Sequence, residues 1–472
     1  MRRLNGVDAL LLYSEMPNVH MHTLKVAVIE LDEHRRDLGV EDFRQIMHRR
    51  LYKLDPLRYQ LIDIPFKFHH PMWRENCDID LDYHIRSWQL PEPGGRRELD
   101  EAIGEIASTP LDRGHPLWEM YYVEGLANGR VAVVCKIHHA LADGIASGNL
   151  MARAMDLQSG PQGDQDSYAT DPNPGKSELV ASAFIDHLRQ IARVPATVKY
   201  SADGLARVRR SSRTLSPELT RPFTPPPSFM NHMLDSQRRF ATATLALADI
   251  KQTATHLGVT LNDLVLAISA GALRKLLLHY DGAADHPLLA SVPVSFNFDP
   301  DRVAGNYFSG MMVALPADVA DPLERVRCTH AAAVLAKESH QLVGPELVAR
   351  WLDYLPQAPA EALFKWLSSR DGQNKVLNLP ISNVPGPRER GRVGGALVTE
   401  IYSVGPLTAG SGLNITVWSY VDQLNISVLT DGATVDDPHE ATAAMLGAFS
   451  EIRSAAGLSG ELTVIETAMA QA

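Results

Sequence analysis

The stretch that decides the fold is Val131-Ala-Val-Val-Cys-Lys-Ile137, followed at once by His138-His139-Ala-Leu-Ala-Asp143-Gly144. The compact β-branched run predicts a central strand, and the residues after Gly144 have helical spacing to about Leu157. The segment is therefore a strand, a loop and a helix. It displays polar side chains at a strand end, from which they can reach a cleft.

These polar residues suit proton transfer. An imidazole that titrates near pH 6.5 can accept a hydroxyl proton and return it to a leaving group, which contributes roughly 10²- to 10⁴-fold in rate. Asp143 either anchors the loop through a basic partner or caps the following helix, and Gly144 permits a tight turn and close approach of a ligand. A lone histidine is usually an ordinary polar loop residue, but the whole string favours a catalytic site.

Other catalytic schemes find little support. The pair His69-His70 has Arg74 at the position equivalent to Asp143 and no following glycine, so we expect it to be structural. The sequence contains no G-x-S-x-G, H-E-x-x-H, G-x-x-x-x-G-K or G-x-G-x-x-G motif. Cys135 lies inside the apolar strand, where packing is its expected role rather than nucleophilic attack.

Length and composition limit the possible domain organisation, partners and location of the protein. The 472 residues predict two or three lobes, of which we take two large ones. The net charge of −11 argues against a nucleic-acid partner, and three widely separated cysteines suggest neither disulfides nor a zinc site, as expected in a reducing cytosol. The start, Met1 to Met16, does not resemble a signal peptide, and no apolar run approaches 18 residues. We therefore expect a cytoplasmic protein whose membrane association is at the surface.

Strand and helix patterns alternate along both halves, which predicts an α/β or α+β fold. The further expected strands are Thr23–Leu31, Trp118–Val123, Phe240–Ala248, Leu288–Phe296, Tyr307–Leu315, Leu413–Tyr420 and Leu424–Leu429. The expected helices are Val40–Leu51, Glu98–Ser108, one starting near Thr260 with Asp263 at the capping-box position, Leu323–Ala336, Pro345–Leu355 and His439–Ile452.

A crossover connects the two halves. Residues 158–176 have linker composition, Val180, Phe184, Leu188 and Ile191 have helical spacing up to Pro195, and a Pro-rich tract at 222–227 closes the connection. From Phe184 to Arg213 seven basic residues face two acidic ones, a net charge of +5. This basic amphipathic segment either lies on an anionic bilayer or is a connecting helix whose apolar face packs on the body.

Several short motifs carry a resemblance to a known family. H-H-x-x-x-D-G is the signature of the CoA-dependent acyltransferase superfamily. The surrounding motifs narrow the resemblance to the bacterial wax ester synthase/diacylglycerol acyltransferase family, closest to actinobacterial triacylglycerol synthases, over nearly the entire chain. They are Leu4-Asn5-Gly6-Val7-Asp8, Met21-His22, Pro116-Leu117-Trp118, Asn262-Asp263, Ser382-Asn383-Val384-Pro385-Gly386-Pro387 and Gly412-Leu413-Asn414-Ile415.

The resemblance implies roles for individual residues. His139, the second histidine, corresponds to the base, and Asp143 is mainly structural. Trp118, Asn262 and Asp263 belong to motifs tied to folding or to the shape of the substrate site, but a core aromatic and a helix cap are equally ordinary explanations. The asparagines that can donate to the thioester oxygen or position CoA are Asn306, Asn383 and Asn414.

The resemblance also implies two acyltransferase-like lobes of mixed sheets covered by helices, with a central substrate channel. The expected divisions are 1–157, 158–235 for the crossover and 236–472. In a ternary complex His139 would take the acceptor proton while the second lobe holds the oxyanion. We expect long-chain acyl-CoA and diacylglycerol as substrates, with fatty alcohol giving wax ester as a second activity. Neither a metal nor a cofactor other than co-substrate acyl-CoA is expected.

Two alternatives stay open at this point. One is a condensation-type acyltransferase that uses carrier-protein thioesters. The other is a non-catalytic lipid-binding protein on the inner face of the plasma membrane or on lipid droplets, for which the basic segment would be the functional part.

Overall fold

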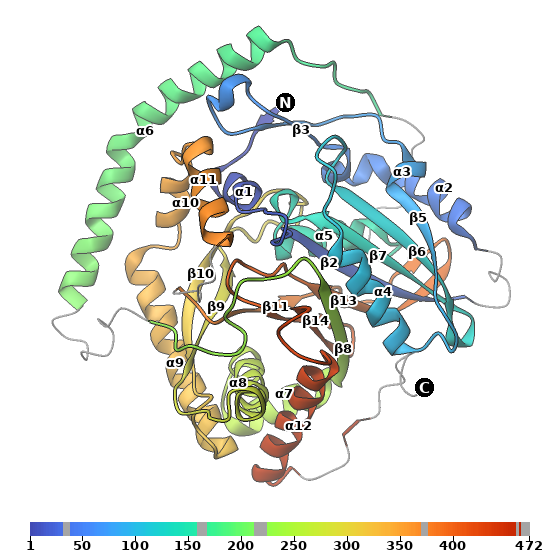
Figure 1. The fold of residues 1–472 in the computed structure, drawn as a ribbon, viewed down its shortest axis with the longest axis vertical. Coiled ribbons are helices and arrows are strands. Elements are labelled where there is room, and N and C mark those ends of the chain that lie inside the picture. The colour runs from blue at the N-terminus through green and yellow to red at the C-terminus, as the bar shows by residue number, and fades with distance from the viewer. Residues whose placement is uncertain (32–37, 158–167, 212–223, 370–375, 459–461, 464–472) are drawn as a thin grey trace.

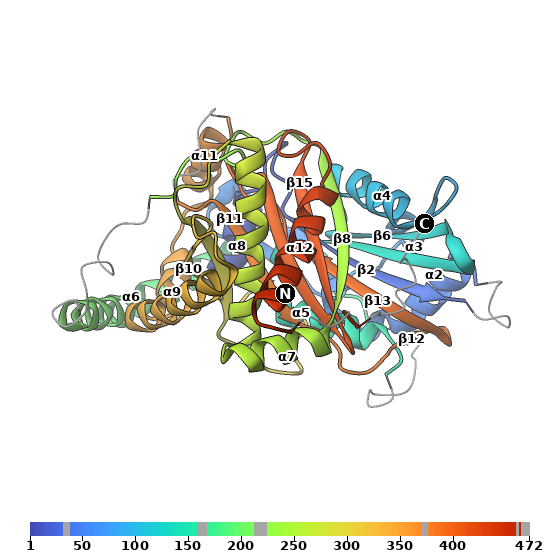
Figure 2. The same ribbon diagram turned by 90° about the horizontal axis from the view of Figure 1, so that it is seen from below.

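The computed structural model describes residues 1–31, 38–157, 168–211, 224–369, 376–458 and 462–463. Two six-stranded sheets meet near the middle of the molecule, and helices cover them (Figures 1 and 2). The expected two-lobed architecture of mixed sheets covered by helices is confirmed.

The first sheet has the order β12-β13-β2-β7-β6-β5. Only β5 and β6 pair in parallel; the other pairs are antiparallel. The central strand β7 is almost entirely buried, as its apolar run predicts. The strands of this sheet are β12 (Arg392–Val393), β13 (Ala396–Val404), β2 (His22–Glu30), β7 (Arg130–His138), β6 (Trp118–Leu126) and β5 (Ile85–Gln89).

The second sheet has the order β10-β9-β11-β14-β15-β8. Its strand β11 is parallel to β9 and β14, and the other pairs are antiparallel. Its strands are β10 (Phe308–Leu315), β9 (Leu288–Ser295), β11 (Leu379–Pro385), β14 (Leu413–Tyr420), β15 (Gln423–Asp431) and β8 (Arg238–Ala246). A small third sheet consists of β1 (Arg2–Arg3), β4 (Met72–Arg74) and β3 (Gln60–Ile62).

Helices surround the sheets. In the second lobe α8, α9 and α12 contact one another and the sheet, while α4 contacts both β7 and β8 and so lies between the lobes. The helices are α1 (Gly6–Tyr13), α2 (Val40–Arg50), α3 (Leu81–His84), α4 (Arg96–Ser108), α5 (Gly144–Ala154), α6 (Lys176–Ser211), α7 (Leu247–Leu257), α8 (Leu261–Tyr280), α9 (Pro322–Val343), α10 (Leu347–Leu352), α11 (Gln357–Ser368) and α12 (His439–Ala455).

The predicted acidic capping box begins α8. Thr260 Oγ1 accepts from the Asp263 backbone N–H at 3.1 Å, and the Asp263 carboxylate accepts from the Thr260 N–H at 3.0 Å. Most of α8 is buried, as expected for a helix that is apolar on all sides. Among the described residues no single helix has the length and apolarity to cross a membrane; α7 and α8 meet that test only as a pair bent by 99°.

The two sheets are joined through β13, which lies late in the chain yet pairs with β2 of the first sheet. At this junction Asn425 of β15 donates to the Ile401 carbonyl at 2.8 Å. Arg96 of α4 donates to Glu400 of β13 at 3.1 Å and to Thr242 of β8 at 2.7 Å. The divisions 1–157, 158–235 and 236–472 stay a prediction; the structure adds that residues 392–404 extend the first sheet.

Most expected elements are confirmed, but β11 and β13 are not among those that the sequence predicts. Strand β11 contains Pro380 and Pro385, and prolines normally argue against a strand. The alternation in β13 is interrupted by a bulge between Val398 and Glu400, which hides the period of two.

The helix expected to end at Pro195 instead continues to Ser211. A proline within a helix removes one backbone hydrogen bond. Here Pro195 and Ile191, whose carbonyl loses its partner, are both exposed, so water can supply that bond. Within the predicted linker residues 158–167 lie outside the described residues, as do Arg213 and the first two residues of the 222–227 tract.

The contacts at this junction predict different losses of stability when Arg96 or Arg97 is replaced. Arg96→Met leaves the fully buried Glu400 carboxylate unpaired and should lower the free energy of unfolding by about 3–5 kcal/mol. Arg97→Met, which removes an exposed pair with Asp437, should cost about 1 kcal/mol or less. Urea denaturation of both variants measures the difference, and equal losses would contradict this role for Arg96.

Candidate active site

Strand β7 ends at His138, and a single helical turn over His139–Leu141 leads into α5. The predicted strand, loop and helix are therefore present. Because successive side chains of a strand point to opposite faces, the two histidines at its end face different surroundings.

His138 faces inward and is completely buried. The Ala140 backbone N–H donates to its Nδ1 at 3.0 Å, so its proton is on Nε2, 3.6 Å from Glu15 Oε1. Glu15 also accepts from Arg113 at 2.9 Å. Burial alone would raise the pKa of Glu15, but His138 and Arg113 hold it below its ordinary value. This arrangement fixes the orientation of His138.

His139 is half-buried and is held by its backbone. Its N–H donates to the Met21 carbonyl at 2.8 Å, and its carbonyl accepts from Asn306 Nδ2 at 2.8 Å. Its Nδ1 is buried without a partner among the described residues, and its ring packs 5.7 Å from that of Phe308. Burial, helped by the charge of Lys25, lowers the pKa of His139 to about 4. The imidazole is therefore neutral near pH 7, as a general base must be.

Asn306 lies behind this loop. Its Nδ2 donates both to the His139 carbonyl and to Asp8 Oδ1, each at 2.8 Å, and its backbone N–H donates to the same Asp8 oxygen at 2.9 Å. Burial raises the pKa of Asp8 to about 7. Since both amide hydrogens are used, the geometry favours Asn306 as a residue that positions His139 over the predicted donor to the thioester oxygen.

Asp143 is an anchor between the lobes as well as a helix cap. It accepts from the Ala146 N–H at 2.9 Å, from Arg302 at 2.9 and 3.0 Å and from the Tyr307 N–H at 3.0 Å. Both ions of the pair are almost fully buried. The structure thus identifies Arg302, in the second lobe, as the basic partner that the sequence left unnamed.

Gly144 lies where α5 packs closely on β11. A Cβ at this position would lie 3.1 Å from a methyl group of Val384 in β11. The glycine is the first residue of α5, so the structure gives packing of α5 on β11 as its function in place of the expected tight turn.

Two other predicted residues meet at the amino end of α8. Asn383 of β11 donates to the side-chain oxygen of Asn262 at 3.4 Å, and both residues are half-buried. The neighbouring Asp263 caps α8 and forms an ion pair with His330 at 2.8 Å. Asn262 and Asn383 are therefore accessible enough to stay substrate-site candidates, whereas Asp263 has one oxygen, Oδ2, engaged by the helix cap and by His330.

Trp118 and Asn414 have structural partners. The Trp118 indole is buried, donates to the Leu57 carbonyl at 2.7 Å and stacks on His84 at 4.2 Å. Asn414 donates to the Pro406 carbonyl at 2.9 Å and accepts from Thr416 at 3.0 Å. These contacts favour the core-aromatic explanation for Trp118 and a similar packing role for Asn414.

The pair His69-His70 and the thiol of Cys135, for which we expect structural roles, have surroundings that agree with those roles. In the pair His69-His70, His70 is hydrogen-bonded to Tyr13 at 2.7 Å and to the Asp353 carbonyl at 3.1 Å. Burial raises the pKa of Cys135 to about 12, so its thiol stays protonated and is a poor nucleophile.

Lys25 is a functional candidate that sequence reasoning missed. Its buried ammonium donates to Ser403 at 2.5 Å and lies 5.2 Å from the centre of the Trp418 ring. Burial lowers its pKa to about 8. The sequence feature that could have identified Lys25 is the position of a lysine inside the apolar strand from Thr23 to Leu31. Asp8, inside the Leu4–Asp8 motif, was the comparable signal for the Asn306 contact; Glu15 and Arg302 had none.

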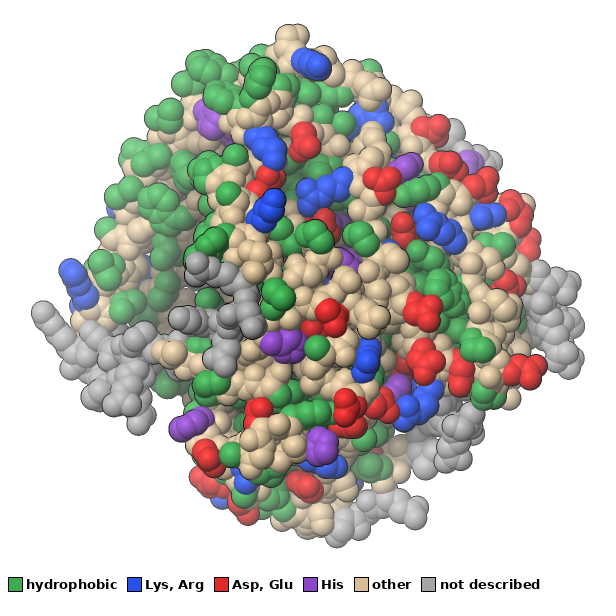
Figure 3. All heavy atoms as spheres, in the orientation of Figure 1, with side chains coloured by type: hydrophobic (Ala, Val, Ile, Leu, Met, Phe, Trp, Pro, Cys, Tyr) green, Lys and Arg blue, Asp and Glu red, His purple; other side chains and the backbone are tan. Residues whose placement is uncertain are grey.

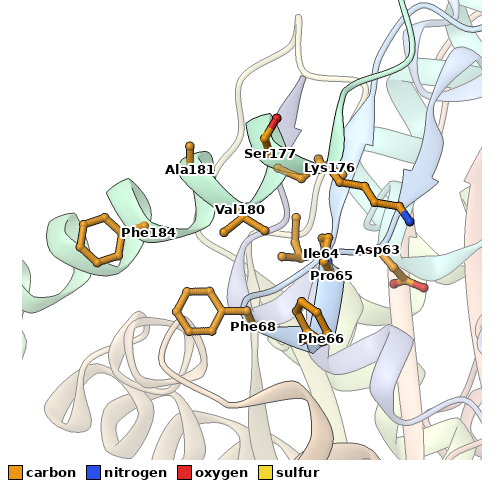
Figure 4. Close-up of a pocket in the computed structure, with 11 residues that line it drawn as sticks. Asp63, Ile64, Pro65, Phe66, Phe68, Lys176, Ser177, Val180, Ala181 and Phe184 are labelled. Carbon is orange, nitrogen blue, oxygen red and sulfur yellow. The ribbon is translucent and has the colours of Figure 1, made fainter.

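Two hollows on the described surface are lined by residues away from His139. One, of about 1020 Å³, lies between α6 and the turn at residues 63–68 (Figure 4). The other, of about 520 Å³, lies between β5, β6 and the end of α4. The channel expected between the lobes stays a prediction.

Comparison with known proteins now adds to this geometry. Residues 4–265 match the model of the wax ester synthase/diacylglycerol acyltransferase catalytic domain, and residues 304–453 match that of the WS/DGAT C-terminal domain. The chain belongs to the wax ester synthase/diacylglycerol acyltransferase family. It is therefore an acyltransferase of this type, which confirms the resemblance seen in the sequence.

Relatives and solved structures of similar fold agree with this family. A Mycobacterium tuberculosis H37Rv protein, provisionally named a diacylglycerol O-acyltransferase, is 72% identical over the full length of both chains. The wax ester synthase/diacylglycerol acyltransferase from Marinobacter aquaeolei VT8 superposes with a TM-score of 0.69 at 24% identity, covering 97% of this chain and 100% of that one. The first condensation domain of the calcium-dependent antibiotic synthetase shares the fold (TM-score 0.58, 13% identity, 97% of each chain).

The anchor at Asp143 can be tested against a matched aspartate. Asp143→Asn leaves the buried Arg302 guanidinium without a counter-ion and should lower the free energy of unfolding by about 3–5 kcal/mol. Asp301→Asn, which removes an exposed partner of Arg153, should cost about 1 kcal/mol or less. Both are measured by urea denaturation; a small loss for Asp143→Asn would show that the lobes do not depend on this pair.

Proposed function

We propose that this member of the wax ester synthase/diacylglycerol acyltransferase family makes triacylglycerol from long-chain acyl-CoA and diacylglycerol, and wax ester from fatty alcohol as a second activity. The observation that carries the proposal is the neutral, half-buried imidazole of His139, whose backbone is held by Met21 from one lobe and Asn306 from the other. The name of the 72% identical relative supports diacylglycerol as the acceptor.

In the proposed reaction His139 acts as the general base. Because its Nδ1 is buried, Nε2 accepts the acceptor's hydroxyl proton. The resulting oxygen attacks the thioester carbonyl, and the tetrahedral oxyanion collapses with cleavage of the carbon–sulfur bond. The CoA thiolate leaves and takes the proton from His139. These steps use acyl-CoA as co-substrate, form no acyl-enzyme and require no cofactor.

Lys25 is our candidate for stabilising the oxyanion. Its ammonium has three N–H donors, and the only acceptor shown for it among the described residues is Ser403. A buried cation near the reacting carbonyl favours the negative charge that develops there, and the same charge keeps His139 neutral. Asn306 is less suited, since both of its amide hydrogens are engaged.

The central experiment incubates purified protein with labelled palmitoyl-CoA and a mixture of diacylglycerol and hexadecanol, then separates the neutral lipids. We expect triacylglycerol as the main product. His139→Ala should lower kcat/KM by about 10²- to 10⁴-fold because the base is lost, while the exposed His48→Ala should have no effect. Near-wild-type turnover by His139→Ala, or activity only with an acyl carrier protein thioester, would contradict the proposal.

The pH dependence tests the environment of His139. The base works only when it is neutral, so a pKa near 4 predicts constant kcat/KM from about pH 7 to pH 5.5 and a decline only on further acidification. Lys25→Met removes a charge that lowers this pKa, so the acid limb should move to higher pH. A limb near pH 6.5 that is identical in both proteins would mean that neither burial nor Lys25 acts on the catalytic base.

A further inference from the structure

Helix α6 runs along the outer edge of the molecule, away from both sheets (Figures 1 and 2). Its amino end packs Leu179 and Ala183 against Ile64 and Met72, and its further contacts with the body are mostly polar. Gln190 donates to the Asp353 carbonyl at 2.7 Å, Ser201 accepts from the Trp351 indole at 3.0 Å and Arg207 donates to the Leu342 carbonyl at 3.1 Å. The residues of this face that are buried between Gln190 and Arg207 are Thr197 and Gly204.

A second face of α6, about 100° around the helix from the contact face, is apolar and exposed. Its large side chains recur at intervals of three, four and seven residues, so they form one stripe along the helix. Their exposed fractions are 57% for Phe184, 53% for Leu188, 66% for Ile191, 49% for Val198 and 52% for Leu205. These large apolar side chains stay about half exposed, which argues against the alternative in which the apolar face of this segment packs on the body.

The apolar stripe continues onto the turn at residues 63–68. Phe66 is 97% exposed and has a φ of 61°, a left-handed conformation that costs a bulky residue free energy. Together with Phe68, Val180 and Phe184 it lines the 1020 Å³ hollow, as Figure 4 shows. In Figure 3 hydrophobic side chains follow the α6 edge of the molecule. A strained backbone that presents an aromatic ring to solvent indicates a surface built for contact.

The charge of α6 is opposite to that of the whole protein. The helix has seven basic residues and three acidic ones, whereas the chain has a net charge of −11. Lys199 and Arg210 are exposed beside the apolar stripe. Basic residues next to exposed apolar side chains are typical of helices that lie in the interface of a membrane.

We propose that the α6 stripe and the Phe66–Phe68 turn form a membrane-docking surface whose partner is the interfacial region of an anionic phospholipid bilayer. The aromatic and aliphatic side chains enter the boundary between headgroups and acyl chains, and the basic residues pair with lipid phosphates. The proposal concerns a surface separate from His139 and extends beyond the proposed reaction. A second copy of this chain would cover the stripe but would repel its basic residues.

Sedimentation with vesicles tests the proposal with the full-length protein. We expect binding to vesicles of phosphatidylglycerol and phosphatidylcholine, weaker binding at high salt and little binding to phosphatidylcholine alone. Phe66→Ser combined with Phe184→Ser should weaken binding at least tenfold, and Lys199→Gln or Arg210→Gln about fivefold each. Phe298→Ser, at a 70% exposed phenylalanine outside the surface, is the matched control and should bind normally.

The outcomes separate this proposal from the proposed reaction. His139→Ala should bind vesicles as well as the wild type, because binding does not depend on turnover. The proposal is overturned if the wild type does not bind anionic vesicles, if it binds only triolein emulsions, or if the double phenylalanine variant binds normally. A dimer in sedimentation velocity that the double variant converts to monomer would identify a second copy as the partner and would also overturn it.

Discussion

The buried Asp143 carboxylate is the constraint on which the site depends. It caps α5 in the first lobe and accepts hydrogen bonds from Arg302 and the Tyr307 backbone in the second. A buried charge is stable only when it is paired and its oxygens are bonded. The carboxylate therefore fixes the distance between the loop that carries His139 and the segment that carries Asn306, and the Asn306 contact with the His139 carbonyl follows from it.

The junction between the two sheets, where β13 packs on the second sheet, also affects the pKa of His139. The packing of β13 against β14 and β15 excludes water from the interface in which Lys25 and Trp418 lie. In such surroundings the protonated imidazole is disfavoured both by burial and by the nearby ammonium. The lowered pKa of the ring is thus a property of the closed interface between the lobes. It would not follow from the histidine loop alone.

Helix α6 departs from the pattern that folding favours. About half of the free energy of burial is forgone for each large apolar side chain of its exposed stripe, and Phe66 adds a strained backbone. Natural proteins violate local folding rules mainly where function requires it. Helix α6 and the histidine loop are separate parts of the surface, and we propose proton transfer for the loop and contact with lipid for the helix.

The sequence by itself determined the local structure: the strand from Val131, the histidine loop, the caps at Asp143 and Thr260, most strands and helices, and the family. These features depend on periodicity and on hydrogen bonds within about four residues. The tertiary structure alone decided the partners of those residues. Arg302 lies 159 positions from Asp143 and Asn306 lies 167 positions from His139. Such contacts depend on which surfaces meet when the chain folds, and the local sequence pattern does not predict that. The same holds for the pairing of β13 with β2 and for the exposure of the apolar face of α6.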